Sequence, residues 1–221
     1  AMEAAQAFAK HLSEAGITLD GETTRAAASG GAKEVASVSS APLSDVLSVS
    51  LKTSDNTMTE VEGRLVAVQA KETADFAGAS KAVLAQLGKD GFDTSGLTLL
   101  DASGLAKGNK VPARLLAQIL AKAAGGEGGS AGRTLIADLP VAALDGTLTN
   151  RLHDTTAAGT VRAKTGSLER TSSLAGVVTT ADGRLLAFSI LANDFPANGG
   201  GAAAAVIDSR FVAPLASCGC S

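Results

Sequence analysis

The sequence predicts an α/β (α+β) fold, in which an antiparallel sheet is flanked by helices and accompanied by an all-helical subdomain. Apolar residues that recur at helical spacing through much of residues 41–124 predict the helices. Three β-patterned segments in the last third predict the sheet, and Asp182-Gly183 between the last two is a strong hairpin signal. A chain of 221 residues can bury roughly 70% of its unfolded surface, so a real core is expected.

The composition indicates an aliphatic core and argues against two classes of partner. Hydrophobic residues make up 45% of the chain and aromatic residues only 3%, with no Trp or Tyr. The net charge is -3 and there is no run of Lys or Arg, so we expect no nucleic-acid partner. No apolar stretch approaches the ~18 uncharged residues that a bilayer-spanning helix needs.

The two ends of the chain leave questions open. Ala1-Met2-Glu3 lies directly in a helical pattern, so we expect the natural polypeptide to begin earlier. Cys218 and Cys220 are compatible with a local bridge, a bridge to another segment or two free thiols. Two sulfurs without nearby His are too few for a structural zinc site, and we expect neither a metal nor another cofactor.

The first 40 residues are expected to hold one helix and a connector. Residues 3–15 carry apolar residues on one helical face and end at Gly16. Residues 17–40 then alternate short β-like pieces, 17–19 and 35–38, with Gly and Ser. This pattern is typical of a connector that returns into a larger domain.

The helical subdomain is predicted to turn sharply at Ser54-Asp55-Asn56. Pro42 can open a helix whose apolar face runs to Leu51, and this helix leads directly into that motif. Thr57-x-x-Glu60 then has the pattern of a capping box, so a second helix is expected to start there. Its apolar stripe comprises Val61, Leu65 and Val68.

Further helices are expected before the sheet. Residues 74–87 form a helix predicted to bury Phe76, and residues 97–100 form a short strand. Pro112 opens another helix, which ends in a flexible glycine-rich loop at residues 125–129.

The last third is expected to form the sheet and its covering helix. The strand-like segments are residues 160–164, 174–180 and 184–192. Residues 199–217 then form a closing helix that can pack on one face of the sheet. The residues expected to make that contact are Val206, Ile207, Phe211 and Leu215.

Two short motifs carry the chemistry. Lys164 and Thr165 offer a positive charge and a hydroxyl donor on a strand, and Gly166 leaves the backbone open to an extended substrate. This suits a peptide that ends in a free carboxylate: Lys164 and Thr165 would hold the carboxylate, while the peptide pairs with the strand at Gly166 and Ser167. Ser54 can relay a proton to a leaving amine, and Asn56 can hydrogen-bond a substrate amide or orient a lysine base.

Other interpretations compete with this one. Ser54-Asp55-Asn56 taken alone is a helix-capping turn, and Lys164 alone is a solvated strand lysine. Residues 128–132 match the Gly-x-Ser-x-Gly elbow around Ser130, with an Asp (Asp138 or Asp145) and then His153 following in α/β-hydrolase order. That elbow needs a strand before it, whereas a helix and a glycine-rich loop are predicted here.

A Ser-x-Asn motif followed by Lys-Thr-Gly forms two thirds of the active site of penicillin-recognising serine enzymes. The chain resembles the C-terminal half of the D-alanyl-D-alanine carboxypeptidase/endopeptidases of the class C low-molecular-mass penicillin-binding protein type (peptidase family S13), particularly actinobacterial members. The segments that carry the resemblance are residues 42–44 leading to 54–56, then 100–105, 139–142, 145–148 and 161–168.

The resemblance implies a β-lactamase/transpeptidase-like fold and a serine peptidase. The implied reaction is acylation of a serine by the D-Ala-D-Ala end or the cross-link of peptidoglycan, followed by hydrolysis. It also implies β-lactam antibiotics and peptidoglycan stem peptides as ligands, and an extracytoplasmic location in the cell envelope. In this interpretation Ser54, Asn56 and Lys164 are catalytic, Thr165, Gly166 and Ser167 bind substrate, and Asp101 and Ser103 shape the floor of the cleft.

The family's nucleophile, in a Ser-x-x-Lys motif, is missing from this chain. None of the ten lysines has Ser, Thr or Cys three residues before it. The resemblance implies that the serine comes from an upstream part of the same protein, with residues 1–40 ending an inserted subdomain and residues 41–221 completing the penicillin-binding domain. The alternative is a non-catalytic relative that binds peptidoglycan or a partner. In both cases the fold is incomplete without the upstream part and this chain alone should not form an acyl-enzyme.

Overall fold

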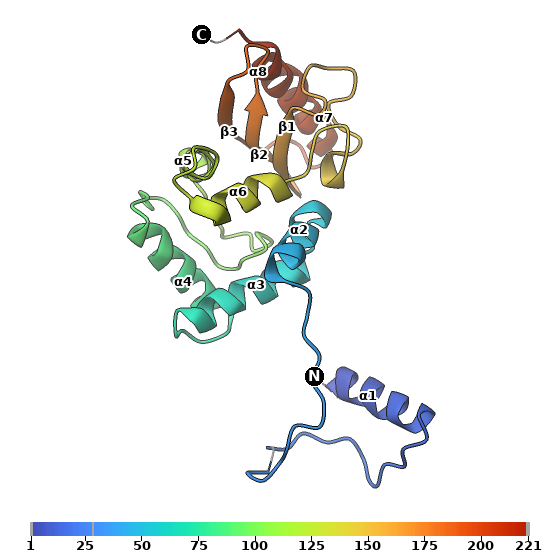
Figure 1. Cartoon of the computed structure of the whole chain (residues 1–221). Coiled ribbons are helices and arrows are strands. Elements are labelled where there is room, and N and C mark those ends of the chain that lie inside the picture. Colours follow the sequence, from blue (N-terminus) through green and yellow to red (C-terminus); the bar gives the residue numbers. More distant parts are fainter. Residues whose placement is uncertain (1, 28, 220–221) are drawn as a thin grey trace. The chain divides into compact units, whose positions relative to one another are not determined.

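The computed structural model describes residues 2–27 and 29–219, and the chain divides into two compact units, Ala1–Ser40 and Ala41–Ser221 (Figure 1). The first unit holds α1 (Met2–Glu14), which buries none of its residues. The β-like pieces predicted at 17–19 and 35–38 do not form strands, and Val35 and Val38 are 98% and 97% exposed. A strand needs a neighbouring strand for its backbone N–H and C=O groups, and no described residue pairs with these segments in that way. The Ile17 N–H instead donates to the Leu12 carbonyl at the end of α1.

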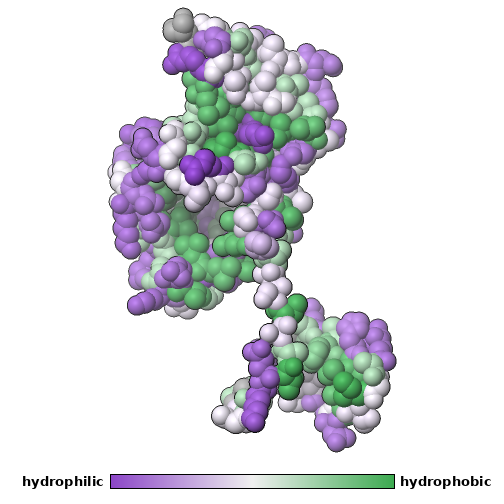
Figure 2. All heavy atoms as spheres, viewed as in Figure 1, coloured by the Kyte–Doolittle hydropathy of each residue, from purple (hydrophilic) through white to green (hydrophobic). Residues whose placement is uncertain are grey.

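The second unit begins with a helical part, which comprises α2 (Leu43–Thr53), α3 (Asn56–Gln69), α4 (Phe76–Lys89), α5 (Ala113–Ala124) and α6 (Gly129–Asp138). Small residues let α3 and α4 approach closely: a Cβ added to Gly63 would lie 3.4 Å from Ala79 Cβ. Several hydrophobic side chains remain exposed at the surface of this part (Figure 2). They include the α3 stripe of Val61, Leu65 and Val68, and Phe76, whose predicted burial is wrong.

Three local predictions in the helical part are also wrong. Asp55, not Thr57, caps α3, because its side chain accepts a hydrogen bond from the Met58 N–H at 2.9 Å. The strand predicted at 97–100 is reduced to one bridge between Thr98 and Lys110. The glycine-rich loop is shorter than predicted, because α6 begins at Gly129.

The sheet has three antiparallel strands in the order β1-β2-β3, namely β1 (Val161–Leu168), β2 (Thr171–Thr179) and β3 (Leu185–Asn193). The predicted strands and the predicted hairpin at Asp182-Gly183 are confirmed, although the loop spans residues 180–184. Gly176 of β2 lies opposite Ala163 of β1, and a Cβ at Gly176 would come within 2.1 Å of the Arg162 carbonyl oxygen.

Helices cover both faces of the sheet (Figure 1). α5 packs against β2 and β3. The other face carries the closing helical run, composed of α7 (Gly200–Val206), the π-helix η2 (Ile207–Val212) and α8 (Ala213–Ser217). A partly buried ion pair between Arg151 and Asp208 ties η2 to the loop that precedes β1.

The closing run buries part of the predicted face, because Ile207 is buried and Leu215 packs against the core as predicted. Ile207, Val212 and Ala216 are buried in the core, whereas Val206 and Phe211 are 49% and 50% exposed. The π-turns change the angular step per residue, so the regular helical spacing used for the prediction does not apply.

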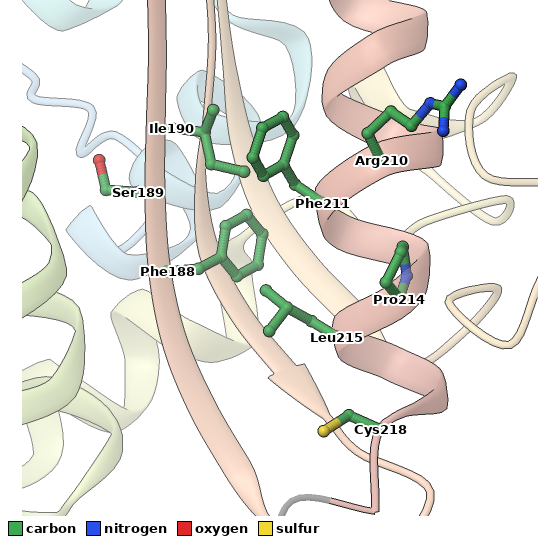
Figure 3. Close-up of a pocket in the computed structure, with 8 residues that line it drawn as sticks. All are labelled: Phe188, Ser189, Ile190, Arg210, Phe211, Pro214, Leu215 and Cys218. Atoms are coloured by element: carbon green, nitrogen blue, oxygen red, sulfur yellow. The ribbon is translucent and has the colours of Figure 1, made fainter.

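A shallow pocket lies between this run and β3 (Figure 3). Phe188 and Ile190 of β3 face Phe211 and Leu215 there. Cys218, at the end of the pocket, is not a free thiol. Cys220, whose pairing the sequence left open, lies outside the described residues.

Candidate active site

The corner between α2 and α3 positions Ser54. Ser54 ends α2 in the left-handed conformation, with φ 56° and ψ 45°. Asp55 immediately caps α3, and its N–H donates to the Ser50 carbonyl at 3.2 Å. Both helices are thus terminated within two residues, and the Ser54 side chain is presented from a backbone that is fixed on both sides.

Lys164 of β1 reaches this corner. Its Nζ donates to Ser54 Oγ at 2.6 Å and to the Thr165 carbonyl at 2.9 Å. The two motifs that the sequence analysis linked are therefore in direct contact, although 110 positions separate Ser54 and Lys164 along the chain.

Burial controls the charge of the lysine. Desolvation lowers the pKa of the Lys164 amine from its ordinary value of 10.5. Both of its hydrogen-bond partners are neutral oxygens, which stabilise the cation less than a carboxylate would. The amine is therefore easier to deprotonate than a solvated lysine, which suits a group that takes up or passes on a proton.

The other predicted site residues lie around this pair. The Thr165 hydroxyl donates to Thr147 Oγ1 at 2.9 Å. Gly166 lies opposite Ser173, where a Cβ would come within 2.3 Å of Ser173 Oγ. Ser167 and Asn56 are exposed, and Asn56 is the first residue of α3.

β1 offers an open edge beside Lys164. Within the described residues it pairs with β2 on one side, and on the other only Val161 and Ala163 bond to the segment 140–142. The edge of β1 from Lys164 onward can therefore accept an extended peptide as an added strand.

Sequence reasoning missed a second set of contacts at the site. The Asp145 carboxylate accepts hydrogen bonds from Lys52 Nζ and, at 2.7 Å, from the Val141 N–H. Burial raises the pKa of Asp145, but these hydrogen bonds outweigh it, so the pKa is lowered. In the sequence, Asp145 stands in the segment 145–148 of the family resemblance and in the competing hydrolase order, and neither pattern indicates a contact with Lys52.

Glu60 has a role other than the predicted capping of α3. Its Oε1 accepts from the N–H groups of Ala102 and Ser103 at 3.0 and 2.8 Å. Asp101, buried, holds the same loop from within by accepting from the Gly104 and Ala106 N–H groups. The loop that was expected to shape the cleft floor is thus tied to α3.

The competing hydrolase motif has the wrong local structure. Ser130 lies in the first turn of α6, not in a tight turn after a strand. His153 Nε2 is 2.7 Å from the Thr149 carbonyl oxygen, and His11 pairs with Glu14 on the surface of α1. In residues 2–27 and 29–219 no group of three or more His, Cys, Asp or Glu residues could hold a metal, and no helix there is long and apolar enough to cross a membrane.

Comparison with known proteins gives consistent results. The model of the D-Ala-D-Ala carboxypeptidase 3 (S13) family matches residues 1–211. Carboxypeptidase DacB of Mycolicibacterium smegmatis is 41% identical over 224 residues, which cover all of this chain and 47% of that protein. The D-alanyl-D-alanine carboxypeptidase of Actinomadura sp. (strain R39) is 35% identical over 85% of this chain and 36% of its own length. The chain thus spans less than half of the length of these relatives.

Solved structures show the same fold. Penicillin binding protein 4 (dacB) from Haemophilus influenzae, complexed with a novel β-lactam, superposes with a TM-score of 0.77 at 32% identity, covering 86% of this chain and 44% of that one. A β-lactamase from Chitinophaga pinensis, 21% identical, shares the fold alone, with a TM-score of 0.54 over 71% of this chain and 58% of its own. The predicted β-lactamase/transpeptidase-like fold is confirmed. The chain belongs to the D-Ala-D-Ala carboxypeptidase 3 (S13) family.

Proposed function

We propose that this chain is the part of a serine-type D-Ala-D-Ala carboxypeptidase/endopeptidase that carries the Ser-x-Asn and Lys-Thr-Gly motifs. The observation that carries the proposal is the 2.6 Å contact between Lys164 Nζ and Ser54 Oγ. It joins an amine with a lowered pKa to a hydroxyl that can pass a proton to the leaving amine of a cleaved peptide.

The substrate follows from the groups around this contact. The cation of Lys164 suits a terminal carboxylate, to which the Thr165 hydroxyl would donate in place of Thr147 Oγ1. The exposed amide of Asn56 suits a substrate amide. The open edge of β1 at Gly166 and Ser167 suits an extended peptide. The substrate class is therefore peptidoglycan stem peptides, and β-lactams would acylate the same site. Peptidoglycan lies outside the cytoplasmic membrane, so the proposal includes an extracytoplasmic location.

The nucleophile is assigned to another part of the same protein. No Ser-x-x-Lys motif occurs in the 221 residues, and the matched relatives are more than twice as long. We assign the nucleophilic serine to an upstream segment, residues 1–40 to the end of an inserted subdomain, and residues 41–221 to the C-terminal part of the penicillin-binding domain.

Intact-mass spectrometry with benzylpenicillin tests the proposal. We expect the longest natural polypeptide that contains this chain to gain the mass of the drug, and the 221-residue chain alone to stay unmodified. Lys164→Met should abolish the mass gain in the long polypeptide. Lys89→Met is the matched control, because Lys89 is exposed at the end of α4, and it should acylate normally.

Each alternative predicts a different result. Acylation of the 221-residue chain itself would place the nucleophile within it and contradict the upstream assignment. No acylation of the long polypeptide, together with binding of peptidoglycan peptides, would favour the non-catalytic relative. Labelling of Ser130 by a fluorophosphonate probe would favour the hydrolase interpretation.

A further inference from the structure

The turn at residues 145–147 contacts both α2, which ends at Ser54, and β1, which carries Lys164. On one side, the Asp145 carboxylate accepts a hydrogen bond from Lys52 Nζ, in the last turn of α2. Lys52 lies two residues before Ser54. On the other side, Thr147 Oγ1 accepts from the hydroxyl of Thr165, the residue after Lys164.

The backbone of this turn is packed as closely as its side chains. Gly146 has φ +57°, and a Cβ there would lie 2.8 Å from the Lys52 carbonyl oxygen and 3.1 Å from Pro140. The turn itself is fixed, because Asp145 Oδ1 accepts from the Val141 N–H at 2.7 Å and the segment 140–142 bonds to β1. A displacement of α2 relative to β1 would therefore have to break contacts of this turn first.

We propose that the 145–147 turn positions the Ser54–Lys164 pair, with Asp145 holding the end of α2 through Lys52 and Thr147 holding β1 through Thr165. Asp145 and Thr147 are positioning residues, because they act through Lys52 and Thr165. This proposal rests on the proposed function for its catalytic consequence. A displacement of about 1 Å between reacting groups can cost up to about a hundredfold in rate. We therefore expect the loss of these contacts to lower the rate of turnover more than it lowers the free energy of unfolding.

The catalytic arm uses the longest natural polypeptide and measures the second-order rate constant of acylation by benzylpenicillin, with the melting temperature alongside. We expect Thr147→Val to slow acylation about tenfold, because it removes the hydroxyl and keeps the shape. Thr147→Ser should stay within about twofold of the wild type, since it restores the acceptor. The matched control is Thr160→Val, which should not change the rate. Thr160 lies just before β1, and its hydroxyl donates to the Thr156 carbonyl.

The contact between Lys52 and Asp145 is tested by combining variants. Lys52→Met removes the donor of this contact and Asp145→Asn removes the charge of its acceptor, so the double variant should acylate no more slowly than the slower single variant. Full additivity of the two losses would overturn the assignment of Asp145 to Lys52. A normal rate in Thr147→Val, or failure of Thr147→Ser to recover, would overturn the assignment of Thr147.

A second arm is independent of acylation and uses the 221-residue chain. NMR titration of the Lys164 amine should show a higher pKa in Thr147→Val than in the wild type. The amine is held less firmly in this variant and becomes more exposed to water, so its desolvation decreases. Thr160→Val should leave the titration unchanged. If the wild-type polypeptide is not acylated, the proposed function fails, and this arm alone decides the positioning role. An unmoved titration in Thr147→Val overturns it.

Discussion

Ser54 combines an unfavourable backbone conformation with a contact that the site needs. A residue with a Cβ pays about 1–2 kcal/mol to adopt the left-handed conformation that Ser54 has at the end of α2. Glycine is the usual residue at such a position. The hydroxyl of Ser54 meets Lys164, so the strain is maintained at the place where the chemistry is proposed.

A pair of substitutions separates the effect of the backbone strain at Ser54 from the effect of losing its hydroxyl. Ser54→Gly and Ser54→Ala both remove the hydroxyl, but only glycine relieves the left-handed strain. We expect Ser54→Gly to have a free energy of unfolding about 1 kcal/mol higher than Ser54→Ala. Urea unfolding of the 221-residue chain measures the difference, and equal stabilities would show that the position is not strained.

The buried amine of Lys164 should make stability depend on pH. Its folded-state pKa lies below 10.5, so between that lowered value and 10.5 the unfolded chain binds more protons than the folded one. The free energy of unfolding of the wild type should therefore rise with pH through this window, relative to Lys164→Met. Urea unfolding at neutral pH and at pH 10.5 measures the change. Lys89→Met should follow the wild type, and a parallel course of Lys164→Met and wild type would contradict the burial effect.

Among the elements, the β1-β2 hairpin leaves no room for a side chain at Gly176. A Cβ at Gly176 would lie 2.1 Å from the Arg162 carbonyl oxygen and 2.5 Å from Ala163 Cα, which are backbone atoms of the neighbouring strand. Backbone atoms within a paired sheet cannot move aside separately, so the two strands would have to separate. β1 carries Lys164, and the site depends on this close pairing.

Two glycine substitutions test this difference between elements. Gly176→Ala should lower the free energy of unfolding by about 3 kcal/mol or more, because it overpacks the sheet. Gly88→Ala should raise it by about 0.5–1 kcal/mol, since Gly88 lies within α4 with nothing within 4 Å of an added Cβ. Urea unfolding of both variants measures the effects. A mild effect of Gly176→Ala would show that β1 and β2 can separate without loss of the fold.

At the scale of the whole molecule, the two units differ in how much they bury. α1 buries no residue, and Arg25 and Lys33 are both exposed in a stretch without helix or strand. The core that includes the sheet and the closing helices belongs entirely to residues 41–221. The two units should therefore respond differently to proteases.

Limited trypsin digestion tests this difference. We expect the first cuts after Arg25 and Lys33, leaving a resistant fragment that contains residues 41–221 and still unfolds cooperatively. Mass spectrometry identifies the fragments, and urea unfolding follows the one that remains. Early cuts after Lys122 or Arg151 would contradict the division, because both lie within the second unit.

Several features could be predicted from the sequence because each depends on residues close together along the chain. Strand-like segments at 160–164, 174–180 and 184–192 located the three strands, and Asp182-Gly183 located the hairpin. The two motifs indicated the family and a site, since short motifs keep their spacing in any context. The exposed α3 stripe could not be predicted, because helical periodicity does not tell which face meets another element.

The chain by itself thus determined the order and type of most elements, the Ser-x-Asn and Lys-Thr-Gly motifs and the family to which they belong. Only the tertiary structure decided that Lys164 touches Ser54, that Asp145 receives Lys52 and that Thr147 meets Thr165. These contacts join residues 110, 93 and 18 positions apart. Such contacts depend on how α2, the 145–147 turn and β1 pack together, and packing is a property of the whole core that no local pattern encodes.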